Sequence, residues 1–175
     1  GAISLAGGNI IDARIHTTDD GMALDNFLVQ DGARGPFADP HQLERLKAEV
    51  MRALEGHEPS AERLAARALP QPRAGAFRIQ PAVFVDNKAS NRYTVIEVNA
   101  RDRSALLFEL ARAIYVSRAV IHSAHVATYG ERAVDVFYLT DLGGAKIESA
   151  VRLKALQSRL VKAAAPPAQA GRQAA

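Results

Sequence analysis

The chain has 175 residues, of which 48% are hydrophobic, a length that suits one domain or two small ones. Its 22 basic and 19 acidic side chains are interspersed, so the net charge of +3 does not indicate a nucleic-acid surface. The lack of cysteine excludes disulfides and thiolate chemistry, and no apolar run approaches the roughly 18 residues of a membrane span. We therefore expect a soluble, cytoplasmic protein that binds neither membrane nor nucleic acid.

Three blocks of sequence occur twice in the same order. Residues 11–17 match 122–128, residues 25–31 match 135–141, and Arg45–Ala48 recurs as Arg152–Ala155. The offset changes only between blocks, as it does when loops differ in length. The chain is therefore predicted to contain two copies of one unit.

The first copy is predicted to span residues 1–54. Residues 1–6 fit the end of a helix, and two strand-like runs, 10–17 and 24–30, flank the turn signal Asp19-Asp20-Gly21. No counterpart of residues 94–111 precedes them. We therefore expect this copy to be truncated at its amino end and the chain to be a fragment of a longer protein.

A second helix is predicted to begin after Asp39, which can cap it, with Pro40 at the first helical position and Gln42 three residues past the cap. Its apolar stripe would consist of Leu43, Leu46, Val50 and Leu54.

Proline and glycine mark residues 55–81 as a linker with one short helix over 60–69. The apolar run that follows, 82–86, could complete the first sheet as its last strand. The tail, 165–175, is too poor in bulky apolar residues to pack and is expected to be disordered.

The second copy, residues 82–164, is predicted to be strand, helix, strand, strand, helix. The strand 93–100 leads into a helix that Asp102 or Ser104 could cap. Strands 120–128 and 133–141 form a hairpin around Gly130, and the last helix begins near Lys146, with Ile147, Val151, Leu153, Leu156 and Leu160 as its stripe. The fold class is therefore α+β.

Few residues suggest catalysis. His122 and His125 are three apart in a strand and face opposite ways, and His16, His41 and His57 are isolated, so we expect no metal site. The repeated Asp25 and Asp135 could each bond a neighbouring backbone amide, and neither has a catalytic partner. No phosphate-binding loop or nucleophile motif is present.

The segment Arg101–Ser104 leaves a strand and enters a helix, where free backbone amides favour an anion such as a carboxylate. A capped turn with two solvated arginines explains the same residues equally well on local grounds.

The element order, the turn Asp102-Arg103-Ser104-Ala105-Leu106-Leu107 and the following hairpin resemble the ACT domain, a ferredoxin-like βαββαβ ligand sensor usually found in pairs. More narrowly, several segments are similar to the carboxy-terminal end of the GlnD family of bifunctional uridylyltransferase/uridylyl-removing enzymes, which modify the regulatory protein PII. They are Asn9–Ile15, Asp20–Asp25, Asn87–Ser90, Thr94–Val98, Thr128–Arg132, Asp135–Asp141 and Lys146-Ile147.

The resemblance implies a tandem ACT pair that senses glutamine, or another small amino acid. Ligand binding would shift the balance of the enzyme between attaching UMP to PII and removing it. The ligand would lie between Asp102, Arg103, Ser104, Ala105 and Leu106 of the second copy and Asn9, Ile10 and Ile11 of the first. The family usually has glycine where this chain has Ala105, and the methyl group would limit how closely a ligand approaches the backbone. The family's catalytic regions, with their Mg and UTP, lie outside this chain, so the fragment is expected to bind no cofactor and to catalyse nothing.

Two other interpretations assign the chain a different function. A purely structural ACT pair would dimerise with a second chain or dock on a neighbouring domain without ligand. RNA binding on a ferredoxin-like sheet is disfavoured because the central strands lack paired aromatic residues next to basic ones.

Overall fold

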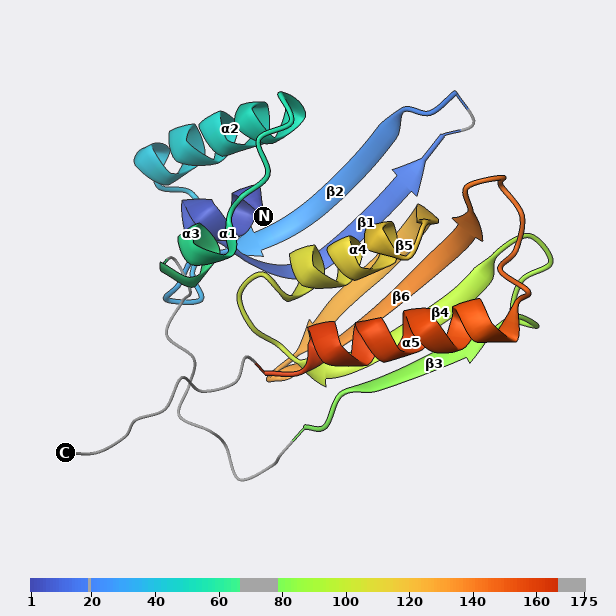
Figure 1. The fold of residues 1–175 in the computed structure, drawn as a ribbon. Helices are drawn as coiled ribbons and strands as arrows, with labels where there is room; N and C mark the ends of the chain where they lie inside the picture. Colours follow the sequence, from blue (N-terminus) through green and yellow to red (C-terminus); the bar gives the residue numbers. More distant parts are fainter. Residues whose placement is uncertain (19, 67–78, 167–175) are drawn as a thin grey trace.

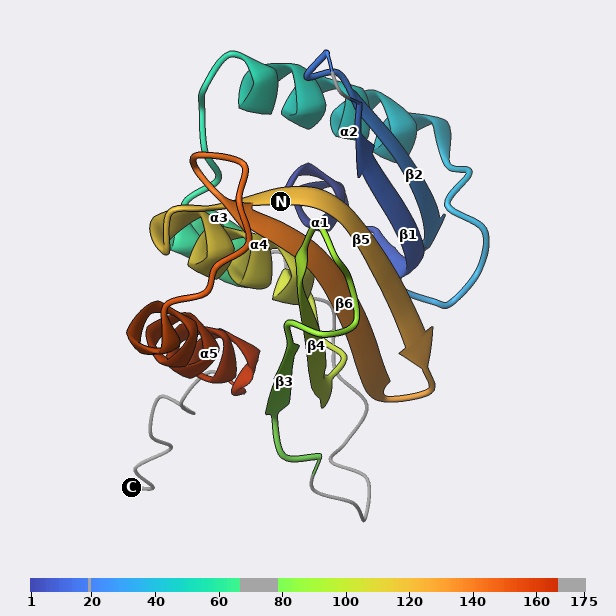
Figure 2. The same ribbon diagram turned by 90° about the vertical axis from the view of Figure 1, so that its right-hand side faces the viewer.

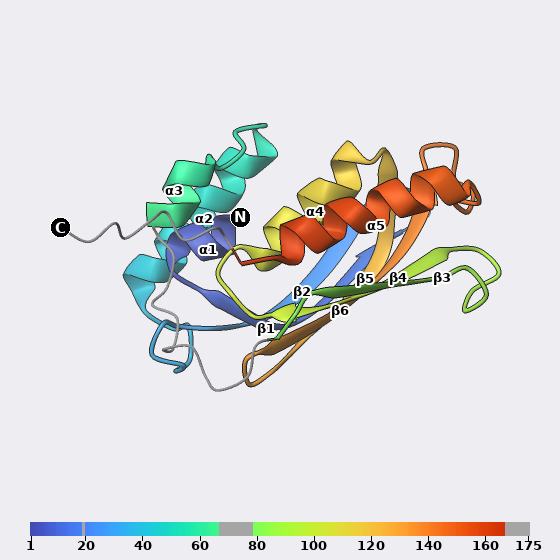
Figure 3. The same ribbon diagram turned by 60° about the horizontal axis from the view of Figure 1, so that its bottom comes forward.

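The computed structural model describes residues 1–18, 20–66 and 79–166. One six-stranded antiparallel sheet, in the order β2-β1-β5-β6-β4-β3, carries the helices on one face (Figures 1 and 3). The elements are α1 (Ala2–Ala6), β1 (Asn9–Thr17), β2 (Ala23–Gln30), α2 (Pro40–Leu54), α3 (Ala61–Ala66), β3 (Ala82–Asp86), β4 (Thr94–Arg101), α4 (Leu106–Val116), β5 (Ala119–Tyr129), β6 (Arg132–Asp141) and α5 (Ala150–Ala164). The predicted α+β class is confirmed.

The second copy contains the main hydrophobic core. Its helices α4 and α5 pack side by side on strands β3 to β6, as the end-on view in Figure 2 makes clear. Fully buried side chains from both layers fill the interface: Ile96, Leu110, Ile114, Phe137, Leu139, Leu156 and Leu160. The unit has the ferredoxin-like arrangement, with β3 at the edge beside β4.

The first copy joins the same sheet through β1, which pairs antiparallel with β5 from Asp12 opposite Ala127 to His16 opposite Ser123. Strand β2 forms the sheet edge, whereas its counterpart β6 lies between β5 and β4. Helix α2 packs against α1. No residue of its predicted apolar stripe is buried: Leu43, Val50 and Leu54 are 45%, 40% and 78% exposed.

Residues 82–86, which the sequence allowed as the last strand of the first copy, pair along β4 at the far edge of the sheet. Val83 is buried in the core beneath α5, and the Gln157 amide donates to the Val83 carbonyl over 2.7 Å. These contacts with α5 explain why this strand lies with the second copy.

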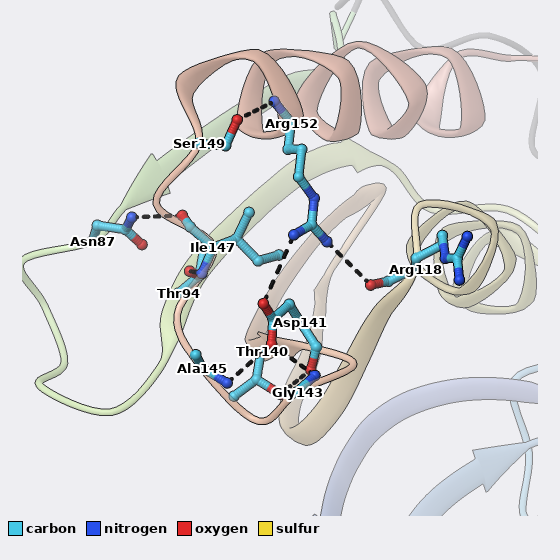
Figure 4. A network of polar contacts seen from close by, with 10 residues as sticks. All are labelled: Asn87, Thr94, Arg118, Thr140, Asp141, Gly143, Ala145, Ile147, Ser149 and Arg152. Atoms are coloured by element: carbon cyan, nitrogen blue, oxygen red, sulfur yellow. Dashed lines mark hydrogen bonds and ion pairs between the residues drawn. The ribbon is translucent and has the colours of Figure 1, made fainter.

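The repeat is visible in matching loops after β2 and β6. Asp31 accepts hydrogen bonds from the amides of Ala33 and Gly35, at 2.9 and 2.7 Å. Asp141, 110 residues later, accepts from Gly143 and Ala145, at 2.9 and 3.0 Å (Figure 4). The same hydrogen-bond pattern therefore recurs at the offset of 110 residues that relates the two loops in the sequence repeat.

Helix α5 begins at Ala150 and not near Lys146, because Ser149 caps it and accepts from the amide of Arg152 (Figure 4). The preceding residues form an anchored loop. Lys146 donates to the carbonyls of Asn87 and Ser90, and the Ile147 amide donates to the fully buried hydroxyl of Thr94 over 2.9 Å.

Helix α2, Pro40–Leu54, agrees with its prediction at both ends. Asp39 caps α2, accepting from the Gln42 amide over 2.9 Å as predicted. The linker helix α3 is described over Ala61–Ala66, and the rest of the predicted span, 67–69, lies outside the described residues, as do residues 167–175 of the tail.

Candidate ligand site between the two copies

A cavity of about 400 Å³ lies where the two copies meet, between the amino end of α4, helices α1 and α2, and the sheet. Its lining is largely apolar and includes Ile3, Ile10, Phe27, Leu106, Leu107, Phe108 and Val126. Three carboxyl groups, those of Asp25, Asp102 and Asp135, also line it. An apolar pocket with a few polar groups is the usual form of a small-molecule site.

The turn between β4 and α4 forms one wall. Ala105 is the N-cap of α4 and has a left-handed backbone with φ of 62°. The prediction that Asp102 or Ser104 caps this helix is wrong: no side chain caps it, because the left-handed residue carries the chain into the helix. The Leu106 amide donates to the Arg103 carbonyl over 3.2 Å. The next first-turn amides, those of Leu107 and Phe108, lack an intrahelical acceptor, and both residues line the cavity.

The opposite wall is set by the end of α1 and the start of β1. Gly7 ends α1 in the left-handed conformation with φ of 87°. A Cβ on Gly8 would lie 2.7 Å from the Val29 side chain and 2.9 Å from that of Ile3, so only glycine fits there. These two glycines bring Asn9 to the cavity.

One polar contact joins the two walls. The Asn9 amide donates to the Asp102 carboxylate over 3.3 Å, linking residues 93 positions apart. Burial raises the pKa of Asp102, and the hydrogen bond from Asn9 partly opposes that rise. The strand start of one copy and the strand-to-helix turn of the other therefore meet at this contact.

The structure places six of the eight predicted site residues on the cavity wall: Asn9, Ile10, Asp102, Arg103, Ala105 and Leu106. Ile11 falls at an irregularity in the β1–β2 pairing, between Ile10 and Asp12, and is not part of the wall. Ser104 does not line the cavity either.

The guanidinium group of Arg103 is bonded to other groups of the protein. It donates two hydrogen bonds to Glu109, at 3.1 and 2.6 Å, and one to the Ala163 carbonyl near the end of α5, at 2.6 Å. These bonds fasten α4 to α5, whereas the buried Nε of Arg103 has no hydrogen-bond partner among the described residues.

The sequence reasoning missed Asp135 as a site residue. Its side chain is 1% exposed, and its Oδ1 atom has no hydrogen-bond partner among the described residues, so the predicted bond to a backbone amide is not formed by that atom. Burial, with the nearby charge of Asp102, raises the pKa of Asp135 to about 7. Its repeat partner Asp25 also lines the cavity, and burial raises its pKa too. The recurrence of an aspartate at this position in both copies is the sequence feature that could have identified Asp135 as a site residue.

Within the described residues, no group of three or more histidine or acidic side chains could hold a metal ion. His122 bonds the Thr140 hydroxyl over 2.9 Å, and its ring lies 5.1 Å from that of Tyr93.

None of the described helices is long and apolar enough to cross a membrane.

No family model and no solved structure matches the chain. Curated relatives do: the protein of Novosphingobium aromaticivorans is 58% identical over 94% of the chain, that of Erythrobacter litoralis 52% over 97%, and that of Zymomonas mobilis 53% over 94%. All three are named bifunctional uridylyltransferase/uridylyl-removing enzyme, and the chain spans about 18% of the length of each. The chain is thus a homologue of one segment of the bifunctional uridylyltransferase/uridylyl-removing enzymes.

Proposed function

We propose that the chain is the amino-acid-sensing segment of an enzyme that attaches UMP to PII and removes it, and that its cavity binds glutamine. The single observation that carries this is the meeting of Asn9 and Asp102, from different copies, on the wall of one cavity. A ligand held there contacts both copies at once. Its binding therefore favours one relative arrangement of the copies, which is what a regulatory site requires.

The chemistry of the walls suits a free amino acid. The uncapped start of α4 offers backbone amides and the positive end of the helix dipole to a carboxylate. The carboxyl groups of Asp102 and Asp135 offer acceptors to an ammonium group. The apolar surface between them accommodates a short aliphatic side chain.

Calorimetric titration of the folded chain with glutamine tests the proposal. We expect saturable heat that Asp102→Ala abolishes. Asp12→Ala serves as the matched control, because Asp12 lies in β1, outside the cavity, and its replacement removes the same charge. Absence of heat with every proteinogenic amino acid would contradict the proposal.

That negative result would favour the second candidate, a structural pair that operates without ligand. The exposed apolar side chains of the edge strand β2 support this candidate, since Leu24 and Leu28 are 62% and 58% exposed. Sedimentation analysis distinguishes it, because a structural pair would associate through this edge with or without glutamine.

A further inference from the structure

Asp135 is a buried acid, and one of its carboxyl oxygens has no hydrogen-bond partner within the described part of the chain. Its side chain projects from the middle of β6, where Val98 of β4 and Val126 of β5 lie opposite it on the two sides. A carboxyl group in such surroundings weakens the fold unless something bonds to it. Its Oδ1 nevertheless has no partner among the described residues, and the residue lines the cavity.

We propose that Asp135 accepts the ammonium group of the bound amino acid, with Asp102 beside it, and thereby determines that the ligand must carry a cationic nitrogen. This inference rests on the proposed function, since it assigns the part of the same cavity that recognises the α-amino group. It adds a residue from β6 to a site otherwise built from the turn before α4 and the start of β1.

The composition of the cavity favours an organic cation over a metal ion. Asp25, Asp102 and Asp135 line one cavity, but the described part of the chain has no set of three such groups close enough to hold a metal. An ammonium group needs only one or two acceptors, and it donates up to three hydrogen bonds. The mostly apolar remainder of the lining suits the carbon chain attached to it.

The charged groups around Asp135 leave it available for a ligand. Asp102, from the turn before α4, raises its pKa, and Asp25 of β2 adds a further acid to the lining. Arg103 lines the cavity but is held by Glu109 and the end of α5.

Ligand binding should therefore displace a proton. With a pKa of about 7, Asp135 is about half protonated at neutral pH, and an ammonium group stabilises only its ionised form. The proton passes to the buffer as the ion pair forms. We expect release of about half a proton per ligand at pH 7, and an affinity that falls by up to about tenfold per pH unit below it.

The experiment titrates the folded chain with glutamine and with 4-carbamoylbutanoate, which is glutamine without its amino group. Wild type should bind glutamine at least about tenfold more tightly than the analogue, a loss typical of one charged hydrogen bond. Asp135→Asn should weaken glutamine binding by about the same factor and bind the two compounds alike. Asp12→Asn, the matched control outside the cavity, should behave as wild type.

Calorimetric titration of wild type with glutamine in buffers of different ionisation enthalpy gives the number of protons released on binding. This measurement needs no variant, so it can be made even if Asp135→Asn does not fold. Proton release in wild type and none in Asp135→Asn supports the assignment. Glutamine affinity that is unchanged by Asp135→Asn, or equal binding of the analogue to wild type, overturns it while leaving glutamine sensing intact. Conversely, if no amino acid binds but n-butylamine binds in a manner that depends on Asp135, glutamine sensing fails and the ammonium site stands.

Discussion

Ala105 holds a backbone conformation that its side chain disfavours, and replacing it with glycine should stabilise the protein. At φ of 62° the Cβ of an L-residue crowds its own backbone at a cost of roughly 1–2 kcal/mol, whereas glycine has no such cost. Against this gain stands the greater freedom of glycine in the unfolded chain, worth about 0.4–1 kcal/mol. The net effect of Ala105→Gly is a stabilisation of about 0.5–1 kcal/mol.

Thermal unfolding followed by circular dichroism measures this effect. For a chain of this size we expect the midpoint to rise by about 2–3 °C. Ala155→Gly, at an exposed position inside α5, provides the matched control and should lower stability by about 1 kcal/mol. If Ala105→Gly also lowers the midpoint, the left-handed conformation at residue 105 is refuted as the source of strain.

Three further predictions concern other buried groups. The pKa of Asp135 is higher in the folded state than in the unfolded chain, so the folded state holds the proton more tightly. The free energy of unfolding should therefore fall as pH rises from about 4 to 7, by at most about 1.4 kcal/mol per pH unit. Melting curves of Asp135→Asn should lose this dependence on pH. Arg103→Ala, which unfastens α4 from α5, should cost about 1–2 kcal/mol in urea unfolding, whereas Arg112→Ala, exposed on α4, should cost nothing measurable. Thr94→Val, which leaves the amide of Ile147 without its acceptor, should cost about 1–3 kcal/mol by the same assay, and equal stability would show that water replaces the hydroxyl.

Much of the fold could be predicted because periodicity and repetition are local properties of the chain. Strand alternation located β4, β5 and β6, and the turn residues around Gly130 located their hairpin. The cap at Asp39 located α2 within one residue. The position of β3 was not predictable, since a five-residue apolar strand fits either sheet edge and only its packing under α5 decides between them.

The candidate site could be anticipated only in part. The turn at residues 102–106 carries a sequence pattern, so its place at the cavity was expected. Asp135 is marked in the sequence only by its recurrence as Asp25, and that recurrence does not show whether a buried aspartate in a strand bonds a backbone amide or remains without a partner. The difference depends on Val98 and Val126, which arrive from other strands. The role of Arg103 was likewise hidden, because its contact with the end of α5 spans 60 residues.

An NMR titration of the ¹⁵N-labelled chain with glutamine shows whether one amino acid binds between the two copies. Binding in the cavity should cause saturable shifts of the backbone amides of Asn9, Leu106 and Asp135, which come from three separate elements that line it. Amides at the far end of α4, such as that of Tyr115, should not move. Shifts confined to residues away from the cavity, or none at millimolar glutamine, would show that no amino acid binds between the two copies.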